Sequence, residues 1–90
     1  MTFEQLEYFL AAARAETFFD AAESLHITQS SLSKQIMKLE KELNVRLFDR
    51  SRRSAVLTDA GREFLKEAGD LFHRYRAMRK RMQAFEDVSE

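Results

Sequence analysis

Residues 17–43, TFFDAAESLHITQSSLSKQIMKLEKEL, decide the fold. Thr17 and Thr28 are typical N-cap residues, because a threonine hydroxyl accepts a hydrogen bond from a free backbone N–H in the first helical turn. After the second cap, apolar residues recur at steps of four, three and four, at Leu32, Ile36, Leu39 and Leu43. This spacing is typical of one buried helix face. We therefore expect a helix over 18–25, a turn of three residues, and a longer helix that ends at Asn44 in a left-handed conformation.

The segment before this stretch predicts one more helix. Thr2 and Gln5 match a capping box, in which two side chains each accept a hydrogen bond from an otherwise free backbone N–H. One helical face is then apolar, formed by Phe3, Leu6, Phe9, Leu10 and Ala13. The chain thus begins with a helix that can pack on the two that follow.

The segment after it changes pattern. Residues 45–48 and 55–57 are short β-prone runs that flank a polar stretch, which predicts a small two-stranded hairpin. Thr58 with Asp59 then caps a final helix that runs to about Phe85.

Composition excludes several classes of protein. Among 90 residues there are no cysteines, no prolines and two glycines, so disulfides and thiolate metal sites are impossible. The longest apolar run, 8–13, is far shorter than the roughly 20 residues of a membrane helix. The acidic first residues do not match a signal peptide. Eight phenylalanines and a hydrophobic share of 44% suffice for a packed core, so we expect a folded protein inside a cell.

The formal net charge is zero, but the charges are unevenly spread. Residues 1–25 carry one base against five acids, residues 26–62 carry eight bases against four acids, and residues 63–90 carry six of each. A neutral total would argue against a nucleic-acid partner. The basic middle, however, coincides with the longer helix and the hairpin, so the distribution is more informative than the sum.

The outer face of the longer helix is polar and basic. At 100° per residue, Ser30, Lys34, Met37 and Lys41 lie opposite the apolar face. Small hydroxyl side chains allow a helix to approach base edges in a major groove, and ammonium groups meet phosphates. Any one of these residues alone is more often a plain surface residue than a DNA contact. A short helix, a tight turn and a longer helix together, however, form a helix-turn-helix layout. We predict DNA contacts from Thr28, Gln29, Ser30, Ser33, Lys34, Met37 and Lys38.

The predicted hairpin carries a second basic element. Arg50, Arg52 and Arg53 lie at its tip, where guanidinium groups can pair with phosphates or enter a narrow minor groove. A solvated loop is the plain alternative. Beside a helix-turn-helix, we predict a DNA-binding wing.

The final helix carries an unbroken heptad pattern. Its apolar residues recur at alternating steps of four and three, at Phe64, Ala68, Leu71, Tyr75, Met78, Met82 and Phe85. From Asp59 to Phe85 such a helix is about 40 Å long at ~1.5 Å per residue, longer than one small core can cover. We predict that these residues form the interface of a homodimer. The alternative is that the helix folds back along its own domain.

These residues closely resemble the N-terminal DNA-binding domain of LysR-type transcriptional regulators. The similarity runs through Leu6-x-x-Phe9, the stretch from Phe18 to Glu40, Leu47-Phe48-x-Arg50 and Leu57-Thr58-x-Ala60-Gly61. Four positions depart from the family pattern, which usually has Pro at position 30, Arg at position 34 and Gly at position 44, and often a polar or basic residue where this chain has Met37. Lys34 keeps the charge but loses the bidentate fork of arginine.

The resemblance implies a mainly α, winged helix-turn-helix over 1–58 and a linker or dimerisation helix with an acidic tail over 59–90. It also implies a bacterial cytoplasmic regulator that binds double-stranded promoter DNA at an inverted repeat as an antiparallel dimer. Family members continue into an effector-binding domain, so we expect this chain to be a piece of a longer protein. We expect no cofactor, metal or small-molecule ligand in it.

Several alternatives stay open. A coiled-coil interaction module without DNA binding would use the same heptads, and a molybdate-type regulator has a similar N-terminal domain. An enzyme is disfavoured, because the two histidines, His26 and His73, are far apart and Glu40 and Glu42 share no helix face. The residues do not give the target DNA, activation or repression, the effector, tetramer formation, or by themselves the direction of helix pairing.

Overall fold

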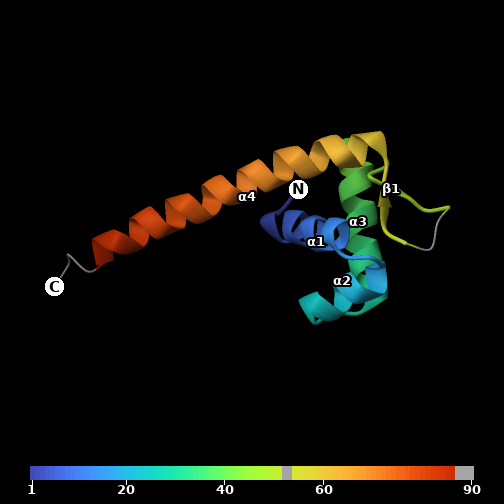
Figure 1. Ribbon diagram of the computed structural model, residues 1–90, viewed down its shortest axis with the longest axis horizontal. Helices are drawn as coiled ribbons and strands as arrows, with labels where there is room; N and C mark the ends of the chain where they lie inside the picture. The colour runs from blue at the N-terminus through green and yellow to red at the C-terminus, as the bar shows by residue number, and fades with distance from the viewer. Residues whose placement is uncertain (52–53, 87–90) are drawn as a thin grey trace.

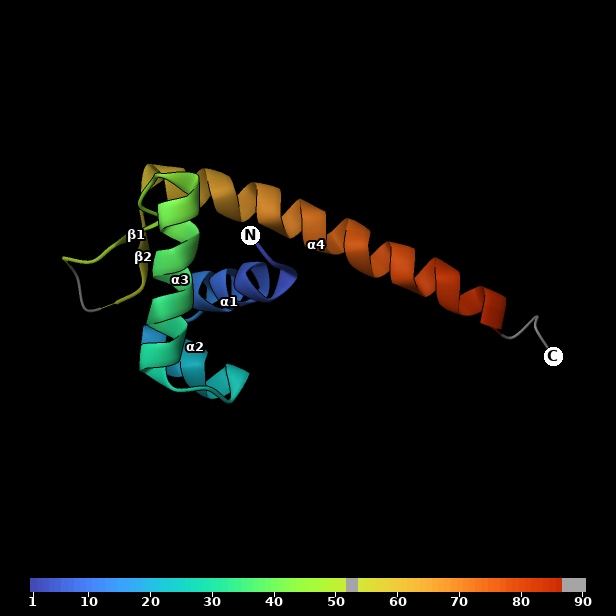
Figure 2. The ribbon, with the colours of Figure 1, turned by 180° about the vertical axis from the view of Figure 1, so that it is seen from behind.

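The computed structural model describes residues 1–51 and 54–86. Over these residues it consists of four helices and a hairpin, in the order α1 (Phe3–Arg14), α2 (Phe18–Leu25), α3 (Gln29–Leu43), β1 (Phe48–Asp49), β2 (Val56–Leu57) and α4 (Asp59–Glu86). The first three helices form a small body, and α4 leaves it as a long arm on the side away from the hairpin (Figures 1 and 2). The molecule measures 55 × 25 × 20 Å. The predicted mainly helical, winged architecture is confirmed.

Threonine hydroxyls begin the first three helices. The Thr2 hydroxyl accepts from the Gln5 N–H at 3.0 Å, and the Gln5 side-chain oxygen accepts from the Thr2 N–H at 3.1 Å, which is the predicted capping box. Thr17 and Thr28 each accept from the backbone N–H three residues further on, at 3.0 and 3.1 Å. All three predicted helix starts are therefore confirmed.

Two helices end at a residue in the left-handed conformation. Asn44 ends α3 with a φ of 58°, as predicted. His26 ends α2 with a φ of 59°, which the sequence did not indicate. Histidine is among the residues that tolerate this region better than most. The sharp change of direction it permits allows α3 to start only three residues after α2 ends.

The core lies where α1, α2 and α3 meet the hairpin and the first half of α4. Phe9 is its centre: its ring lies 5.5 Å from that of Phe48 and 4.9 Å from that of Phe64, centroid to centroid. The buried apolar residues are Leu6, Phe9, Leu10, Ala12, Ala21, Ala22, Leu32, Ile36, Leu39, Leu47, Phe48 and Ala68. They include three of the four residues predicted for the apolar face of α3, and the fourth, Leu43, is partly buried against them.

The hairpin is shorter than predicted. Phe48 pairs with Leu57 and Asp49 with Val56, in antiparallel register, while the predicted first strand over 45–48 is wrong except for its last residue. Before β1, the backbone N–H of Leu47 donates to the carboxylate of Glu40 in α3 and not to a partner strand.

Helix α4 starts against the hairpin and ends away from the body. Thr58 accepts from the Gly61 N–H at 3.0 Å and donates to the Arg46 carbonyl at 2.6 Å, which ties the helix start to the segment before β1. A Cβ at Gly61 would collide with the Leu47 carbonyl oxygen, so only glycine allows this approach. In the described part of the chain, no helix is long and apolar enough to cross a membrane.

Candidate nucleic-acid interface

The junction of α2 and α3 is a tight turn that exposes the start of α3. The Thr28 hydroxyl is occupied as the N-cap and also donates to the Ser31 hydroxyl at 2.9 Å. Ser30 Oγ lies 3.3 Å from the same hydroxyl. Thr28 therefore has a structural role at this helix start whatever else it contacts.

The outer face of α3 is open to solvent where the sequence predicted it. Ser30, Lys34 and Lys38 are exposed, and Met37 is 59% exposed although its side chain is apolar. Ser33 is half-buried, because it lies toward the hairpin. With Leu32, Ile36 and Leu39 fully buried on the other side, α3 turns a polar and basic face outward along its whole length. We refer to α3 as the recognition helix.

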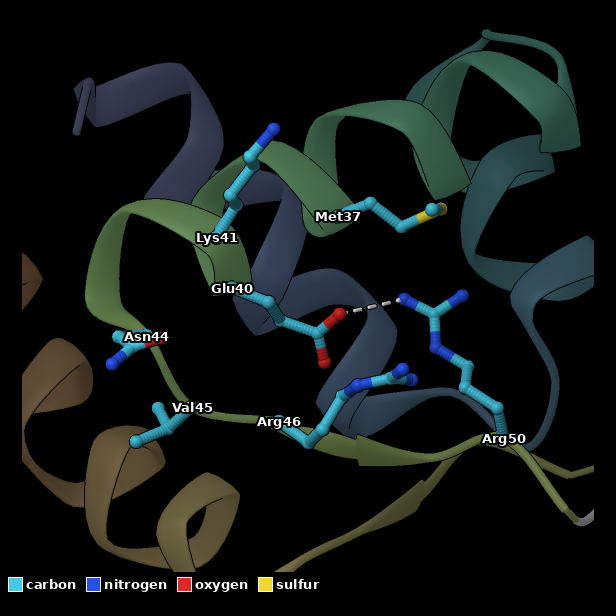
Figure 3. A pocket seen from close by; sticks show the side chains of 7 residues that line it. All are labelled: Met37, Glu40, Lys41, Asn44, Val45, Arg46 and Arg50. Atoms are coloured by element: carbon cyan, nitrogen blue, oxygen red, sulfur yellow. Dashed lines mark hydrogen bonds and ion pairs between the residues drawn. The ribbon is translucent and has the colours of Figure 1, made fainter.

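The hairpin lies beside α3, and two hollows follow their junction. We call β1, β2 and the segment between them the wing. One hollow, of about 170 Å³, is lined by Gln29 and Ser33 of α3 and by wing residues that include Arg50. The other, of about 520 Å³, lies further along α3 and is lined by Met37, Glu40, Lys41, Asn44, Val45, Arg46 and Arg50 (Figure 3). Arg50 borders both hollows.

A buried carboxylate joins the wing to the recognition helix. Glu40 is 6% exposed, and its Oε2 accepts from the N–H groups of Leu47 at 2.7 Å and Phe48 at 3.2 Å. Its Oε1 accepts from Arg50 Nη2 at 3.1 Å (Figure 3). Sequence reasoning missed this role. The only signal was the position of Glu40 directly after Leu39, at the edge of the apolar face of α3.

The predicted wing residues have different placements. The Arg50 guanidinium pairs with Glu40 and lies 5.2 Å from the ring centroid of Phe18, with its side chain 31% exposed. Arg52 and Arg53 lie outside the described residues, so their predicted DNA contacts remain predictions. The structure thus brings Arg50 to the base of the wing, among protein groups, rather than to its tip.

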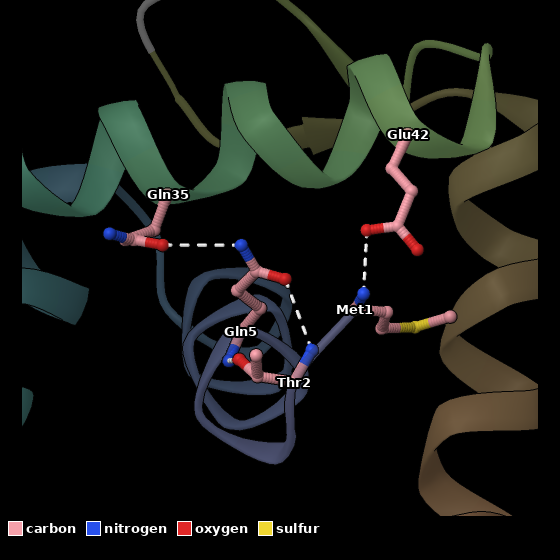
Figure 4. Close-up of polar contacts among 5 residues, drawn as sticks. All are labelled: Met1, Thr2, Gln5, Gln35 and Glu42. Atoms are coloured by element: carbon pink, nitrogen blue, oxygen red, sulfur yellow. Dashed lines mark hydrogen bonds and ion pairs between the residues drawn. The ribbon is translucent and has the colours of Figure 1, made fainter.

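The amino-terminal segment contacts α3 through two polar side-chain interactions. The Met1 ammonium pairs with Glu42 at 2.6 Å, and the Gln5 amide donates to the Gln35 side-chain oxygen at 3.2 Å (Figure 4). These contacts hold α1 across two turns of α3 on a side that leaves the outer face open.

The predicted dimerisation residues divide into two groups along α4. Phe64 packs edge-to-face on Phe9, and Ala68 is 2% exposed, so both belong to the core of their own protomer rather than to a free face. Tyr75 stacks on Phe3. The remaining residues stay open to solvent, at 46% for Leu71, 54% for Met78, 59% for Met82 and 67% for Phe85. A groove of about 660 Å³ runs past Phe3, Leu71, Tyr75, Met78 and Met82.

A helix-turn-helix with an exposed basic recognition helix and a wing beside it defines the class: a winged helix-turn-helix DNA-binding domain. The family model described as bacterial regulatory helix-turn-helix protein, lysR family, matches residues 3–62. The chain belongs to this family and is a DNA-binding domain of a LysR-type transcriptional regulator. Within the described residues, no group of three or more His, Asp or Glu side chains could hold a metal ion.

Relatives and solved structures agree with this assignment. The chain is 45% identical over 82 residues to the HTH-type transcriptional regulator YxjO of Bacillus subtilis, covering 91% of this chain and 28% of YxjO. The chain therefore spans about a quarter to a third of the length of such relatives. A crystal structure of the DNA-binding domain of CbnR with DNA matches at a TM-score of 0.87 and 38% identity, covering 93% of this chain and 97% of that one.

A second solved complex matches even more of the chain. It contains the DNA-binding domain of BenM with catB site 1 DNA, and it matches at a TM-score of 0.94 and 31% identity over the whole of this chain and 97% of that one. The long helix is therefore part of the shared fold and is not peculiar to this sequence.

Proposed function

We propose that this chain binds double-stranded DNA sequence-specifically, with the recognition helix in a major groove and the wing on the adjacent backbone or minor groove. The observation that carries the proposal is the outer face of α3, where Ser30, Lys34 and Lys38 are exposed while the opposite face is fully buried. A helix with short hydroxyls near its N-terminus and ammonium groups further along fits a groove with phosphates on its walls. The solved DNA complexes of CbnR and BenM domains support the same partner.

The residues have different roles in this proposal. Gln29 and Ser33 line the hollow between α3 and the wing, where an amide or a hydroxyl can pair with a base edge. Lys34 and Lys38 meet phosphates, and Met37 offers an apolar contact to a thymine methyl group. Arg52 and Arg53 extend the contact from the wing.

The proposal includes a homodimer that reads an inverted repeat. Four residues of α4 support it, because Leu71, Met78, Met82 and Phe85 expose apolar side chains on an arm that leaves the body. Large apolar side chains repeated along an exposed helix mark an interaction surface. Pairing two such arms would present two recognition helices to DNA at once, which raises affinity without new contacts in either domain.

We propose that this chain is the DNA-binding domain of a longer regulator. The relative YxjO is more than three times as long as this chain, and we propose that the remainder of the regulator carries effector binding and that the whole protein controls transcription in the cytoplasm.

Selection of bound duplexes from a pool of random sequence tests the proposal. We expect enrichment of an interrupted inverted repeat. Affinity for the enriched duplex should fall linearly with the logarithm of salt concentration, with a slope of about −0.9 for each phosphate contacted. Enrichment of no motif, together with an affinity that salt does not change, would rule out DNA binding of this kind. Enrichment of a single half-site would support DNA binding by the recognition helix but would contradict the proposed homodimer on an inverted repeat.

A further inference from the structure

We propose that Glu40 and Arg50 are positioning residues that set the wing against the recognition helix, so that Arg50 serves DNA binding through Glu40 and not by contacting phosphate. The inference rests on the proposed function, and it concerns how two separate DNA-binding elements are held in one geometry.

Glu40 has the contacts of an anchor. Its carboxylate is buried, and a buried carboxylate is destabilising unless it is paired and hydrogen-bonded. Both of its oxygens are used: one accepts two backbone N–H groups at the start of β1, and the other accepts the guanidinium of Arg50. One side chain of α3 therefore holds the first strand of the wing by its backbone and by a side chain.

Arg50 adds a third element to the same cluster. It follows directly after β1, at the point where the chain enters the segment between the strands. Its guanidinium lies over the ring of Phe18 at the start of α2, and that ring packs edge-to-face on Phe48 at 5.0 Å. The end of β1 is thus fixed to α2 and to α3, the two helices that form the helix-turn-helix.

This arrangement disfavours a phosphate contact by Arg50. To neutralise a phosphate alone, the guanidinium would have to leave Glu40 and strand a buried negative charge close to DNA, which is costly. If the guanidinium stays paired with Glu40, the carboxylate largely compensates its charge. Arg50 then contributes by fixing the position of the wing against α3. The hollows on either side of Arg50 depend on this geometry, because both are bounded by it.

The two roles predict opposite signs for Glu40→Gln. The amide has one acceptor oxygen and no charge, so it cannot hold both the strand and Arg50. For a positioning pair, the affinity for the most enriched duplex of the selection should fall roughly tenfold, about the effect of losing one charge-assisted hydrogen bond. Hydroxyl-radical protection should be lost on the wing side and kept where α3 lies. For a phosphate ligand, the same change would release Arg50 and remove an anion, so binding would tighten.

Glu42→Gln is the matched control, because it removes the same charge from an exposed position on the same helix. We expect it to leave affinity unchanged or slightly higher. The double variant Glu40→Gln/Arg50→Gln should bind no more weakly than the weaker single variant, since both changes break one unit. The inference would be overturned if Glu40→Gln bound DNA more tightly, or if the effects of the two substitutions added fully in the double variant. Neither result would contradict the proposed function as long as the wild-type protein binds the duplex.

Circular dichroism would show whether Glu40→Gln fails to fold, and in that case a second variant, Glu40→Asp, tests the inference. Glu40→Asp keeps the charge and shortens the side chain by one methylene, so a direct phosphate role for Arg50 predicts wild-type affinity and an unchanged footprint. The positioning role predicts weaker binding and loss of wing-side protection. If the wild-type protein binds no duplex at all, the proposed function fails first, and that result is distinct from failure of the pair.

Discussion

The ring of Phe3 stacks on the ring of Tyr75, with centroids 4.6 Å apart and planes inclined by 30°. The first residue of α1 thereby holds the middle of α4, and Phe72 adds an edge-to-face contact at 5.8 Å. Beyond this point the arm has left the body. The contact therefore decides where α4 stops being part of the folded core.

Phe3→Ala should destabilise the protein through this contact. We expect the free energy of unfolding to fall by about 1–2 kcal/mol, from the lost aromatic pairs and part of the buried area, because the side chain is already half-exposed. Urea unfolding at two protein concentrations measures it, since a loss within the protomer does not depend on concentration. Phe19→Ala, at a 56% exposed position of α2, is the control and should cost about 0.5 kcal/mol or less.

The two glycines of α4 should respond to alanine in opposite ways. At Gly61 the added Cβ collides with the backbone of Leu47, so Gly61→Ala should destabilise by at least about 2 kcal/mol. At Gly69 a Cβ meets no atom within 4 Å, so Gly69→Ala should stabilise by about 0.5–1 kcal/mol through helix propensity. Thermal melts of both variants check the pair. Equal effects would contradict the close approach of α4 to the segment before β1.

Thr28→Ala should remove the cap of the recognition helix. We expect a loss of about 1 kcal/mol in the free energy of unfolding and weaker DNA binding, because the first turn of α3 frays. Thr28→Ser keeps the accepting hydroxyl and is the matched control. If serine were as damaging as alanine, the methyl group and not the cap would explain the effect.

Lys34→Ala should reduce the salt dependence of DNA binding. Its ammonium is exposed on the outer face of α3, and loss of one phosphate contact lowers the slope of log K against log salt by about one. Lys66→Ala removes the same charge from an exposed position of α4 outside the proposed interface and should leave the slope unchanged. Salt titrations of both variants on one duplex separate a local contact from a general charge effect.

Met78→Glu should weaken the proposed dimer. Met78 is 54% exposed within the apolar stripe of α4, and a carboxylate there would be buried without a partner if two helices paired. Sedimentation equilibrium should show a shift toward the monomer. Lys80→Glu, on the opposite side of the same helix, should leave the association unchanged. An unchanged association of the Met78 variant would argue for a different dimer surface.

The helices and their order were predictable from the amino-acid sequence. Caps and heptads are local: Thr2, Thr17 and Thr28 each satisfy an N–H three residues away, and Leu32 to Leu43 share a face through helical periodicity alone. The outer face of α3 followed from the same geometry. The distribution of charge is also visible in the sequence, because an acidic start and a basic middle add up to a neutral total.

The side-chain contacts of the hairpin and of α4 depend on the three-dimensional packing and could not be predicted from the sequence. The sequence alone gives Glu40 no role and predicts Arg50 as a DNA contact of the wing. The two side chains meet because the chain turns back after Asn44 and places β1 along α3. Ala68 and Met82 occupy the same heptad position two heptads apart, yet Ala68 is buried and Met82 is exposed, because the body ends between them. Periodicity defines the face of a helix, but the end of the packed core defines which part of that face remains for a partner.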